Sequence, residues 1–244
     1  MPEISVVIPT YNESTYVDRL LEDLAKQSYK DFEVIVSDAQ SKDGTSEVVT
    51  SFKDKLDIKF IESPPKGPGH GRNVGAKIAR GEWLLFLDAD VNIDDPNFIR
   101  TILTETEKRG WNTSQGKMAV KGASVIERFG TFLNYNYIKI LSHTKHPVAG
   151  GYCIFTKRDV FEKNKGFNEK IRLGEDYDYV TRVGTNGFGF VEETYYYVDL
   201  RRFKEEGIMF PLKATLNEIY RHSRGYRVDK NLIEYKFGKH PKRK

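Results

Sequence analysis

The sequence predicts an α/β fold in which a mostly parallel central sheet is flanked by helices. The first ninety residues alternate between short apolar runs and stretches with helical spacing, a pattern typical of parallel strands joined by helical crossovers. The chain of 244 residues is long enough to form one α/β domain with a substantial core. Its composition, 39% hydrophobic and 30% charged, is ordinary for a globular protein.

The elements follow from short apolar runs bounded by turn residues. Strands are predicted over residues 4–9, 32–38, 58–63 and 83–90. Helices are predicted between them over 13–27, 43–55 with Asp43 as the cap, and 72–79. The second half is less regular, with strands expected at 118–125 and 152–156, helices at 126–141 and from Glu175, and a helical C-terminus. One domain accounts for this order, because no repeat or linker interrupts it.

Cysteine content and hydropathy exclude several classes of protein. The single cysteine, Cys153, excludes an internal disulfide and leaves too little sulfur for a thiolate metal site. A strand pattern begins almost at once, so we expect no signal peptide, and no apolar run approaches the roughly eighteen residues that a transmembrane helix needs. We therefore expect a cytoplasmic protein.

The chain is mildly basic, with a formal net charge of +4. Its last residues, 236–244, carry five Lys and Arg side chains. This tail is either a solvated terminus or a segment that contacts anionic lipid or nucleic acid, and both interpretations stay open here.

Polar residues follow the ends of three predicted strands. The apolar run 83–87 ends in Asp88 and Asp90, residues 10–13 follow the first strand, and Asp38 ends the second. In parallel sheets the carboxyl ends of strands form one crevice where ligands bind. Carboxylates at the end of a buried strand are costly unless they are paired or bound to a cation. Their oxygens suit Mg²⁺ or Mn²⁺, which bind through one or two carboxylates and substrate phosphates.

The stretch "GPGHGRNVG" does not match a dinucleotide-binding fingerprint. Gly67 and Gly69 fit that spacing, but Arg72 occupies the position of the third glycine, and the stretch follows the third strand rather than the first. We expect a flexible loop that brings Arg72 to the start of a helix. There it either contacts a phosphate or nucleotide or is an ordinary surface residue.

The stretch "LGEDYDY" places two carboxylates directly after a glycine. Glu175 and Asp176 fit the first turn of a helix, where acidic residues are common because they favour the helix dipole. A carboxylate directed into the crevice could equally serve as a general base. The sequence around this pair leaves both interpretations open.

In order along the chain, four stretches resemble glycosyltransferase family 2, whose members are inverting enzymes of GT-A fold. They are "SVVIPTYNE", "FEVIVSDAQSKDGT", "GRNVGAKIARGEWLLFLDADV" and "GGYCIFTKRDVFEKNKGFNEKIRLGEDYDYVTR". The resemblance covers about residues 3–205. One departure lies in the second stretch, where Ala39 and Gln40 replace an aspartate and a glycine of the family pattern. Recognition of the nucleotide base could be altered there.

The resemblance implies a role for each matching residue. Asp176 would be the catalytic base, with Glu175 beside it. Asp90, together with Asp88, would hold a divalent metal, Mn²⁺ or Mg²⁺. The nucleotide-sugar donor would be held by Pro9, Thr10, Tyr11, Glu13, Asp38, Arg72, Asp88, Arg201 and Arg202.

The resemblance also implies a division of labour along residues 1–244. Residues 1–115 would bind the nucleotide-sugar, 116–205 would bind the acceptor, and 206–244 would form a basic helical extension. The implied reaction transfers a sugar, most commonly from UDP, to an acceptor hydroxyl on a glycan or a lipid-linked carrier, and we expect no nucleic acid partner. The alternatives are a sugar-phosphate nucleotidyltransferase and a non-catalytic module that binds a nucleotide or polyanion.

The aromatic stretch "RFGTFLNYNYIKIL" has three interpretations. It forms a core helix, a wall on which a sugar stacks, or an interfacial face that contacts a lipid-linked acceptor. Peripheral contact with an anionic membrane, at its inner face, is therefore a hypothesis at this stage.

Overall fold

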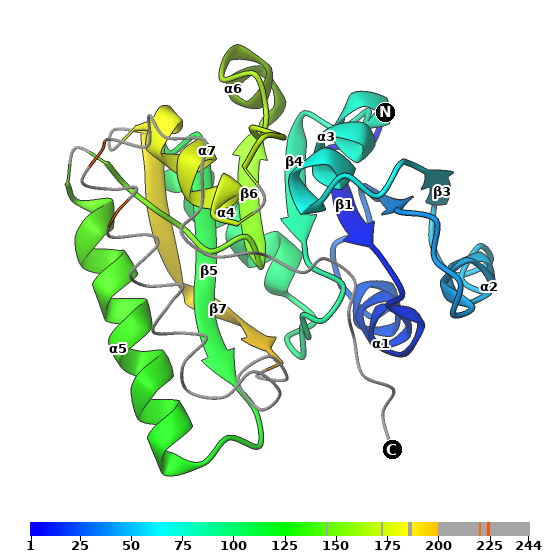
Figure 1. Ribbon diagram of the computed structural model, residues 1–244, viewed down its shortest axis with the longest axis horizontal. Coiled ribbons are helices and arrows are strands. Elements are labelled where there is room, and N and C mark those ends of the chain that lie inside the picture. The colour runs from blue at the N-terminus through cyan, green and yellow to red at the C-terminus, as the bar shows by residue number, and fades with distance from the viewer. Residues whose placement is uncertain (145, 172, 185–186, 200–219, 221–223, 225–244) are drawn as a thin grey trace.

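The computed structural model describes residues 1–144, 146–171, 173–184, 187–199, 220 and 224 (Figure 1). Within them one sheet has the strand order β3-β2-β1-β4-β6-β5-β7. The strands are β1 (Ile4–Thr10), β2 (Phe32–Asp38), β3 (Ile58–Glu62), β4 (Trp83–Leu87), β5 (Thr113–Val120), β6 (Cys153–Lys157) and β7 (Phe188–Val198). The helices are α1 (Ser14–Ala25), α2 (Thr45–Thr50), α3 (Pro68–Ile78), α4 (Phe98–Lys108), α5 (Val125–Ser142), α6 (Arg158–Lys163) and α7 (Glu175–Val183).

The sheet is mostly parallel, as predicted. Strands β3, β2, β1 and β4 run in one direction, with Ile4 of β1 paired to Phe32 of β2 and to Trp83 of β4. Strand β6 lies antiparallel between β4 and β5, so β5 again runs in the direction of β4, and β7 is parallel to β5. The carboxyl ends of β1, β2, β4 and β5 therefore meet at one edge of the sheet.

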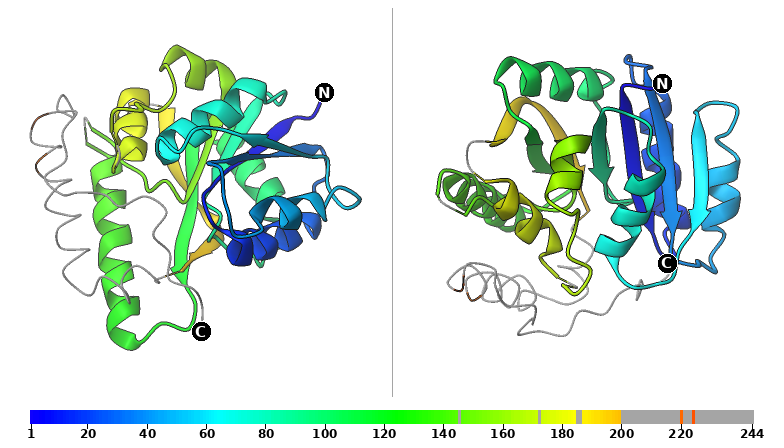
Figure 2. Two further views of the ribbon diagram at one scale, coloured as in Figure 1. Left: turned by 45° about the vertical axis from the view of Figure 1, so that its right-hand side comes forward. Right: turned by 90° about the horizontal axis from the view of Figure 1, so that it is seen from above.

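Helices cover both faces of the sheet (Figure 2), and side chains of the strands alternate between two apolar layers, one on each face. In β4, Trp83, Leu85 and Leu87 pack into the layer built by α1, α2 and α4. Leu84 and Phe86 pack into the layer built by α3, α5, α6 and α7. Burial on both faces explains why β4 is a continuous apolar run rather than an alternating one.

Helix α3 begins four residues earlier than the sequence suggested. Pro68 occupies its first position, where the missing N–H costs nothing, and Gly67 precedes it with φ of 119°. The glycines of "GPGHG" therefore belong largely to a helix rather than to a flexible loop. Arg72 consequently lies inside α3 and not at its start.

Other boundaries differ, and three elements were not expected. The strand predicted over 118–125 is β5, which ends at Val120, because Gly122 turns the chain with φ of 60° and Ser124 caps α5. Strand β4 ends at Leu87 rather than at residue 90, and helix α2 ends at Thr50 rather than near residue 55. Helices α4 and α6 and strand β7 were not expected. The predicted helical extension over 206–244 lies outside the described residues, apart from residues 220 and 224.

Strands β5 and β7 project beyond the carboxyl end of β4. Thr156 of β6 pairs with Leu84 of β4 on one side and with Thr113 of β5 on the other. Gly116 of β5 therefore lies level with Leu87, the last residue of β4. The chain after β4 follows this projection, and the backbones of Asn92 and Tyr197 exchange hydrogen bonds of 2.9 and 3.0 Å. The loop that contains Asp88 and Asp90 is thereby attached to β7.

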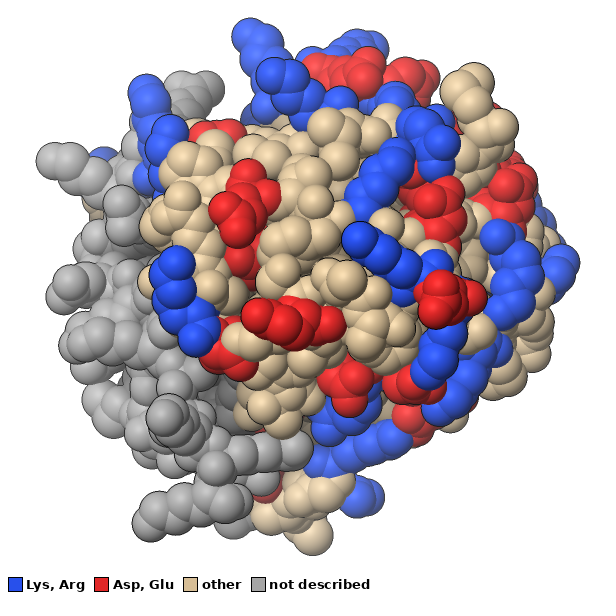
Figure 3. All heavy atoms as spheres, turned by 90° about the vertical axis from the view of Figure 1, so that its right-hand side faces the viewer, with Lys and Arg blue, Asp and Glu red and all other residues tan. Residues whose placement is uncertain are grey.

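Two surface features complete the description. On the face seen in Figure 3, Lys and Arg side chains are interspersed with Asp and Glu rather than gathered by sign. Among the described residues, no helix has the length and apolar character that crossing a bilayer requires.

Candidate functional site

The ends of β1 and β2 are joined by a buried hydrogen-bond cluster. Thr10 Oγ1 donates to Asp38 Oδ1 at 2.8 Å. Ser41 donates to the same carboxylate twice, from its hydroxyl at 2.6 Å and from its backbone N–H at 2.7 Å. Thr10 and Asp38 are both buried. The cluster fixes the Asp38 carboxylate at the carboxyl edge of the sheet.

The remaining residues of β1 and of the turn after it that were predicted to bind the donor lie next to this cluster. Tyr11 is half-buried, and Glu13 is buried directly before α1, with its backbone N–H donating to Thr45 Oγ1 at 3.1 Å. Pro9 lies against α3, since a Cβ added at Gly71 would be 3.0 Å from Pro9 Cβ. Pro9 therefore supports the helix that carries Arg72.

Arg72 connects the end of β4 to the start of α7. Its Nη2 donates to Asp88 Oδ1 at 2.6 Å and to the Gly151 carbonyl at 3.2 Å, and its Nη1 donates to Glu175 Oε1 at 2.6 Å. The guanidinium lies over the Phe167 ring, 5.3 Å from its centroid, and Arg72 is 2% exposed. Its predicted role in donor binding stays a prediction; its observed contacts hold two parts of the site together.

Asp176 is held beside this arginine by a close backbone approach. The Gly151 N–H donates to Asp176 Oδ2, and the Tyr177 N–H donates to Oδ1 at 2.9 Å. A Cβ at Gly151 would be 2.7 Å from Arg72 Nη2 and 2.9 Å from Asp176 Oδ2. Only glycine fits between these two side chains. Asp176 also lies in the first turn of α7, where the helix dipole favours negative charge.

The cluster contains more negative than positive charge. Among the described residues, three carboxylates, those of Asp88, Glu175 and Asp176, surround the guanidinium of Arg72. Burial lowers the pKa of Arg72, but the three carboxylates outweigh it and raise this pKa overall. Burial, and then the charge of Asp176, raises the pKa of Glu175, and burial raises the pKa of Asp176. A further cation would relieve this excess of negative charge.

The carboxylates that follow β4 fit a divalent cation that takes its other ligands from a bound substrate and from water. Among the described residues, no group of three or more His, Cys, Asp and Glu side chains is arranged to hold a metal ion alone. Asp88 and Asp90 are half-buried and offer carboxylate oxygens two residues apart. Mg²⁺ and Mn²⁺ commonly use one or two carboxylates and complete their shell with substrate phosphates and water.

Sequence reasoning missed three residues of this site. The Gly151 amide, the Phe167 ring and the Ser41 hydroxyl each contact a residue that had been predicted. The pair Gly150-Gly151 before a strand was the signal available for the first of these, and the other two had none. The predicted residues Arg201 and Arg202 lie outside the described residues.

Comparison with known sequences identifies relatives of this chain. The sequence model of "Glycosyl transferase family 2" matches residues 5–165. The poly(ribitol-phosphate) beta-N-acetylglucosaminyltransferase TarS of Staphylococcus aureus is 44% identical over 94 residues, which are 37% of this chain and 16% of TarS. The GalNAc(5)-diNAcBac-PP-undecaprenol beta-1,3-glucosyltransferase of Campylobacter jejuni is 32% identical over 183 residues, 70% of this chain and 56% of that protein.

Comparison with solved structures identifies the same fold. The structure of S. aureus TarS 1–349 in complex with UDP-GlcNAc matches with a TM-score of 0.65 and 28% identity, covering 81% of this chain and 58% of that one. The mannosyltransferase PcManGT from Pyrobaculum calidifontis, in complex with GDP-Man and Mn²⁺, matches with a TM-score of 0.75 over 94% of this chain and 66% of that one. At 19% identity, this second likeness concerns the fold alone.

The matched segment covers only part of each relative. It spans about one sixth of TarS and just over half of the Campylobacter enzyme. The family model nevertheless covers about two thirds of the 244 residues, including the ends of β1, β2 and β4. The sheet order and the solved structures agree on the GT-A fold. The chain belongs to glycosyltransferase family 2.

Proposed function

We propose that the chain transfers a sugar from a nucleotide-diphosphate sugar to an acceptor hydroxyl, with inversion at the sugar carbon. One observation carries the proposal. Asp176 and Asp88, the aspartate that follows β4, belong to one hydrogen-bonded cluster that is joined by Arg72 and Gly151. A base for the acceptor and ligands for the diphosphate are thus adjacent. A single displacement needs these two groups and no second nucleophile.

In this mechanism each residue has one task. Asp176 removes the proton from the acceptor hydroxyl as that oxygen attacks the sugar carbon. Asp88 and Asp90 would hold Mn²⁺ or Mg²⁺, which stabilises the charge of the diphosphate leaving group when bound. Arg72 keeps the Asp88 carboxylate and α7 in place. Asp38, Tyr11 and Glu13 line the edge on which the nucleoside would lie.

In this proposal the donor is a UDP-sugar, residues 1–115 form the donor-binding half, and residues 116–205 form the acceptor-binding half. Support comes from the TarS structure, which holds UDP-GlcNAc and is 28% identical to this chain. GDP remains the chief rival, because the more distant PcManGT holds GDP-Man. Ala39 and Gln40 lie next to the buried Asp38, so we expect substitutions at these two positions to change which nucleotide the chain prefers.

Titration calorimetry tests the donor and the metal together. UDP, GDP, dTDP and CDP are titrated into the protein with and without Mn²⁺. We expect one nucleotide to bind in a metal-dependent manner and the Asp90→Ala variant to lose about tenfold to a hundredfold in that affinity, with little change when Mn²⁺ is absent. Binding of none of the four would overturn the proposal in favour of a non-catalytic polyanion-binding module.

The acceptor is proposed to be a glycan or a lipid-linked carrier. The Campylobacter relative acts, by its name, on an undecaprenol-linked glycan, and TarS acts on poly(ribitol-phosphate). Helix α5 supports the lipid-linked alternative. Six of the nine large apolar side chains that are exposed among the described residues lie on it, at helical spacing: Val125, Phe129, Phe132, Leu133, Tyr137 and Ile140.

Contact between this apolar stripe and an anionic membrane is part of the same proposal. Residues 201–244 contain 13 Lys and Arg against 5 Asp and Glu. The basic composition of this segment favours an anionic bilayer as the partner of the stripe. In co-sedimentation with anionic liposomes we expect binding that falls when Phe129 and Phe132 are both changed to Ser, while Tyr195→Ser, an exposed aromatic outside α5, leaves it unchanged. Protein that stays in solution would refute the contact.

A further inference from the structure

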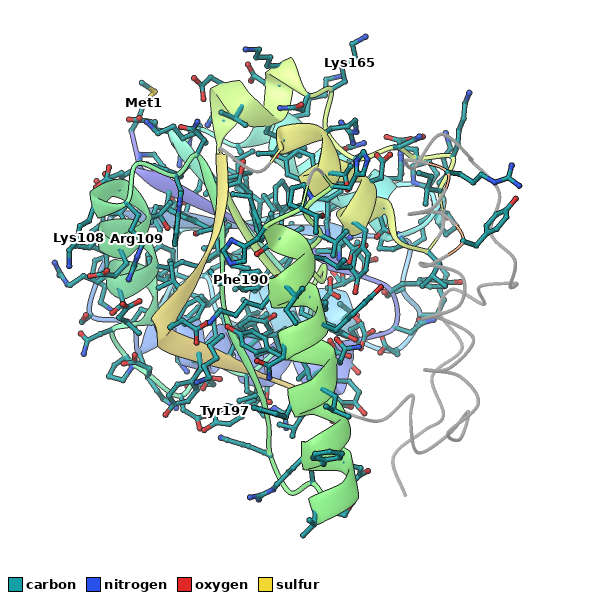
Figure 4. The ribbon with its side chains drawn as sticks, turned by 90° about the vertical axis from the view of Figure 1, so that its left-hand side faces the viewer. Met1, Lys108, Arg109, Lys165, Phe190 and Tyr197 are labelled. Carbon is teal, nitrogen blue, oxygen red and sulfur yellow. The ribbon has the colours of Figure 1, made fainter. Side chains whose placement is uncertain are left out.

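A cavity lies apart from the Arg72 cluster, between the projecting end of β5 and the first half of α5. Its volume is about 470 Å³. The floor is the chain from Lys117 to Gly122, and one wall is formed by α5 through Arg128, Phe132 and Tyr135. Tyr197 of β7 also lines the cavity, and Figure 4 labels it on β7 below Phe190, with α5 in front. We call this cavity the β5–α5 pocket.

The pocket is basic and aromatic. Among the described residues that line it, Lys117, Lys121 and Arg128 are cationic and none is acidic. Tyr135, Phe132 and Tyr197 provide the rings. Aromatic faces pack against sugar and polyol carbons, whereas Lys and Arg bind phosphate oxygens. The lining thus matches a ligand in which a sugar or polyol is directly linked to phosphate.

Carboxylates near the pocket neutralise only part of its charge. Glu192 is shared by two lysines, at 3.8 Å from Lys117 and 2.7 Å from Lys139, and it also accepts a hydrogen bond from Tyr135. Lys121 is paired with Asp94. Four cations, counting Arg128, therefore face two carboxylates.

Arg128 is the cation of this group that has no carboxylate partner among the described residues. Its guanidinium donates from Nε to the Ala123 carbonyl at 3.2 Å, and no carboxylate among the described residues forms an ion pair with it. Its side chain is exposed and lines the cavity. A guanidinium in this position can bind phosphate with two parallel hydrogen bonds.

The pocket is attached to the loop that carries the proposed metal ligands. Tyr197 pairs through its backbone with Asn92, and Lys121 pairs with Asp94 of the same loop. Asn92 is two residues from Asp90, a separation of at most about 7 Å, and paired strand residues lie about 5 Å apart. An acceptor with a few sugar or polyol units that lies beside this loop can therefore extend into the pocket.

We propose that the β5–α5 pocket binds the phosphate group of the acceptor and its adjoining sugar or polyol, so that the enzyme selects phosphate-bearing acceptors over neutral glycans. The inference rests on the proposed function, which it deepens by naming the acceptor class. The phosphate could belong to the diphosphate of a lipid-linked sugar or to a polyol phosphate polymer. Both present the same chemistry to Lys121 and Arg128.

A competition between acceptors tests the proposal. Three probes are compared with one donor: a hexosamine diphosphate on a short water-soluble alkyl chain, a polyol phosphate oligomer, and the neutral alkyl glycoside of the same hexosamine. We expect kcat/KM to favour one of the phosphate-bearing acceptors, and the preferred one identifies the source of the phosphate. The double variant K121Q/R128Q should reduce that preference about tenfold, since each exposed ion pair contributes up to about 1 kcal/mol.

The control removes the same type of charge elsewhere. K108Q lies on α4, on the opposite face of the sheet, and should keep the full preference. Equal turnover of neutral and phosphate-bearing acceptors, or an unchanged preference in K121Q/R128Q, would overturn the pocket assignment while leaving the transferase proposal intact.

A binding measurement separates the two proposals if no transfer is detected. The phosphate-bearing probes and their dephosphorylated counterparts are titrated into the native protein and into K121Q/R128Q by calorimetry. Binding of a phosphate-bearing probe that weakens in the double variant and at high salt would support the pocket even if the transferase proposal failed. Equal binding of phosphorylated and dephosphorylated probes would refute it.

Discussion

Buried carboxylates have opposite electrostatic surroundings at the two edges of the sheet. At the amino edge, Glu33 at the start of β2 is fully buried and accepts hydrogen bonds from Ser5, Lys59 and Arg80. Burial alone would raise its pKa, but these donors outweigh burial and hold the pKa of Glu33 at about 2. At the carboxyl edge, the carboxylates around Arg72 outnumber the cations, and the pKa values of Glu175 and Asp176 are raised.

The difference distinguishes carboxylates that stabilise the fold from carboxylates that are typical of a functional site. Two cations for one carboxylate give a stable ionised network, which contributes to folding. Among the described residues, three carboxylates for one guanidinium give a site whose excess negative charge is balanced only when it binds a cation or takes up a proton. Such perturbed carboxylates are typical of functional sites.

Replacing Asp176 tests the carboxyl edge and has the largest expected effect. Asp176→Asn should lower kcat by about a thousandfold, because removing a general base costs about 10²–10⁴ in rate. Nucleotide affinity should stay within a few-fold of the native value in calorimetry. The free energy of unfolding of the Asp176→Asn variant at pH 7 should not fall, because a neutral side chain reduces the repulsion within this negatively charged cluster. Normal turnover would show that the base is another residue.

Replacing Glu33 tests the amino edge. Glu33→Gln should lower the free energy of unfolding by about 2 kcal/mol, since it leaves Lys59 and Arg80 without their buried partner, although both are partly hydrated. Urea unfolding measures this loss, and kcat should be unchanged. If Glu33→Gln and Asp176→Asn changed stability alike, the contrast between the edges would be wrong.

Acidification should weaken the amino edge over a defined range. The pKa of Glu33 is lowered by folding, so its contribution to stability is complete above the ordinary glutamate pKa of about 4.3 and is lost as the pH falls toward 2. We expect native stability to fall by roughly 1–2 kcal/mol more than that of Glu33→Gln between pH 6 and pH 3, after allowance for the exposure of the partners. Parallel pH profiles for the two proteins would contradict this.

A pair of glycine substitutions gives the smallest and most local test. Gly151→Ala places a Cβ within 3 Å of Arg72 and Asp176 and should lower stability by about 1–2 kcal/mol together with kcat. Gly130→Ala, inside α5 with nothing within 4 Å of the added Cβ, should raise stability by about 0.5–1 kcal/mol. Thermal unfolding of both variants measures the difference, and equal effects would show that Gly151 is not tightly packed.

The sequence was informative where structure is set locally. The apolar run of β4 and the aspartates after it predicted a polar strand end, and Thr10 and Asp38 do meet there. The start of α3 was missed because "GPGHG" is rich in turn residues, and packing against Pro9 and Val7 overrides that preference. The N–H of Gly151 on Asp176, and the pocket between β5 and α5, depend on pairings between distant segments, which periodicity does not encode.

The position of β6 has a consequence for how the chain acquires its fold during synthesis. Strand β6 lies between β4 and β5, yet it follows both along the chain, so β4 has an open edge until residues 153–157 arrive. That edge is the five-residue apolar segment Trp83–Leu87, the kind of unpaired strand that recruits other chains. A nascent or truncated chain that stops before residue 153 should therefore require a chaperone or aggregate, whereas one that includes β6 protects its own edge.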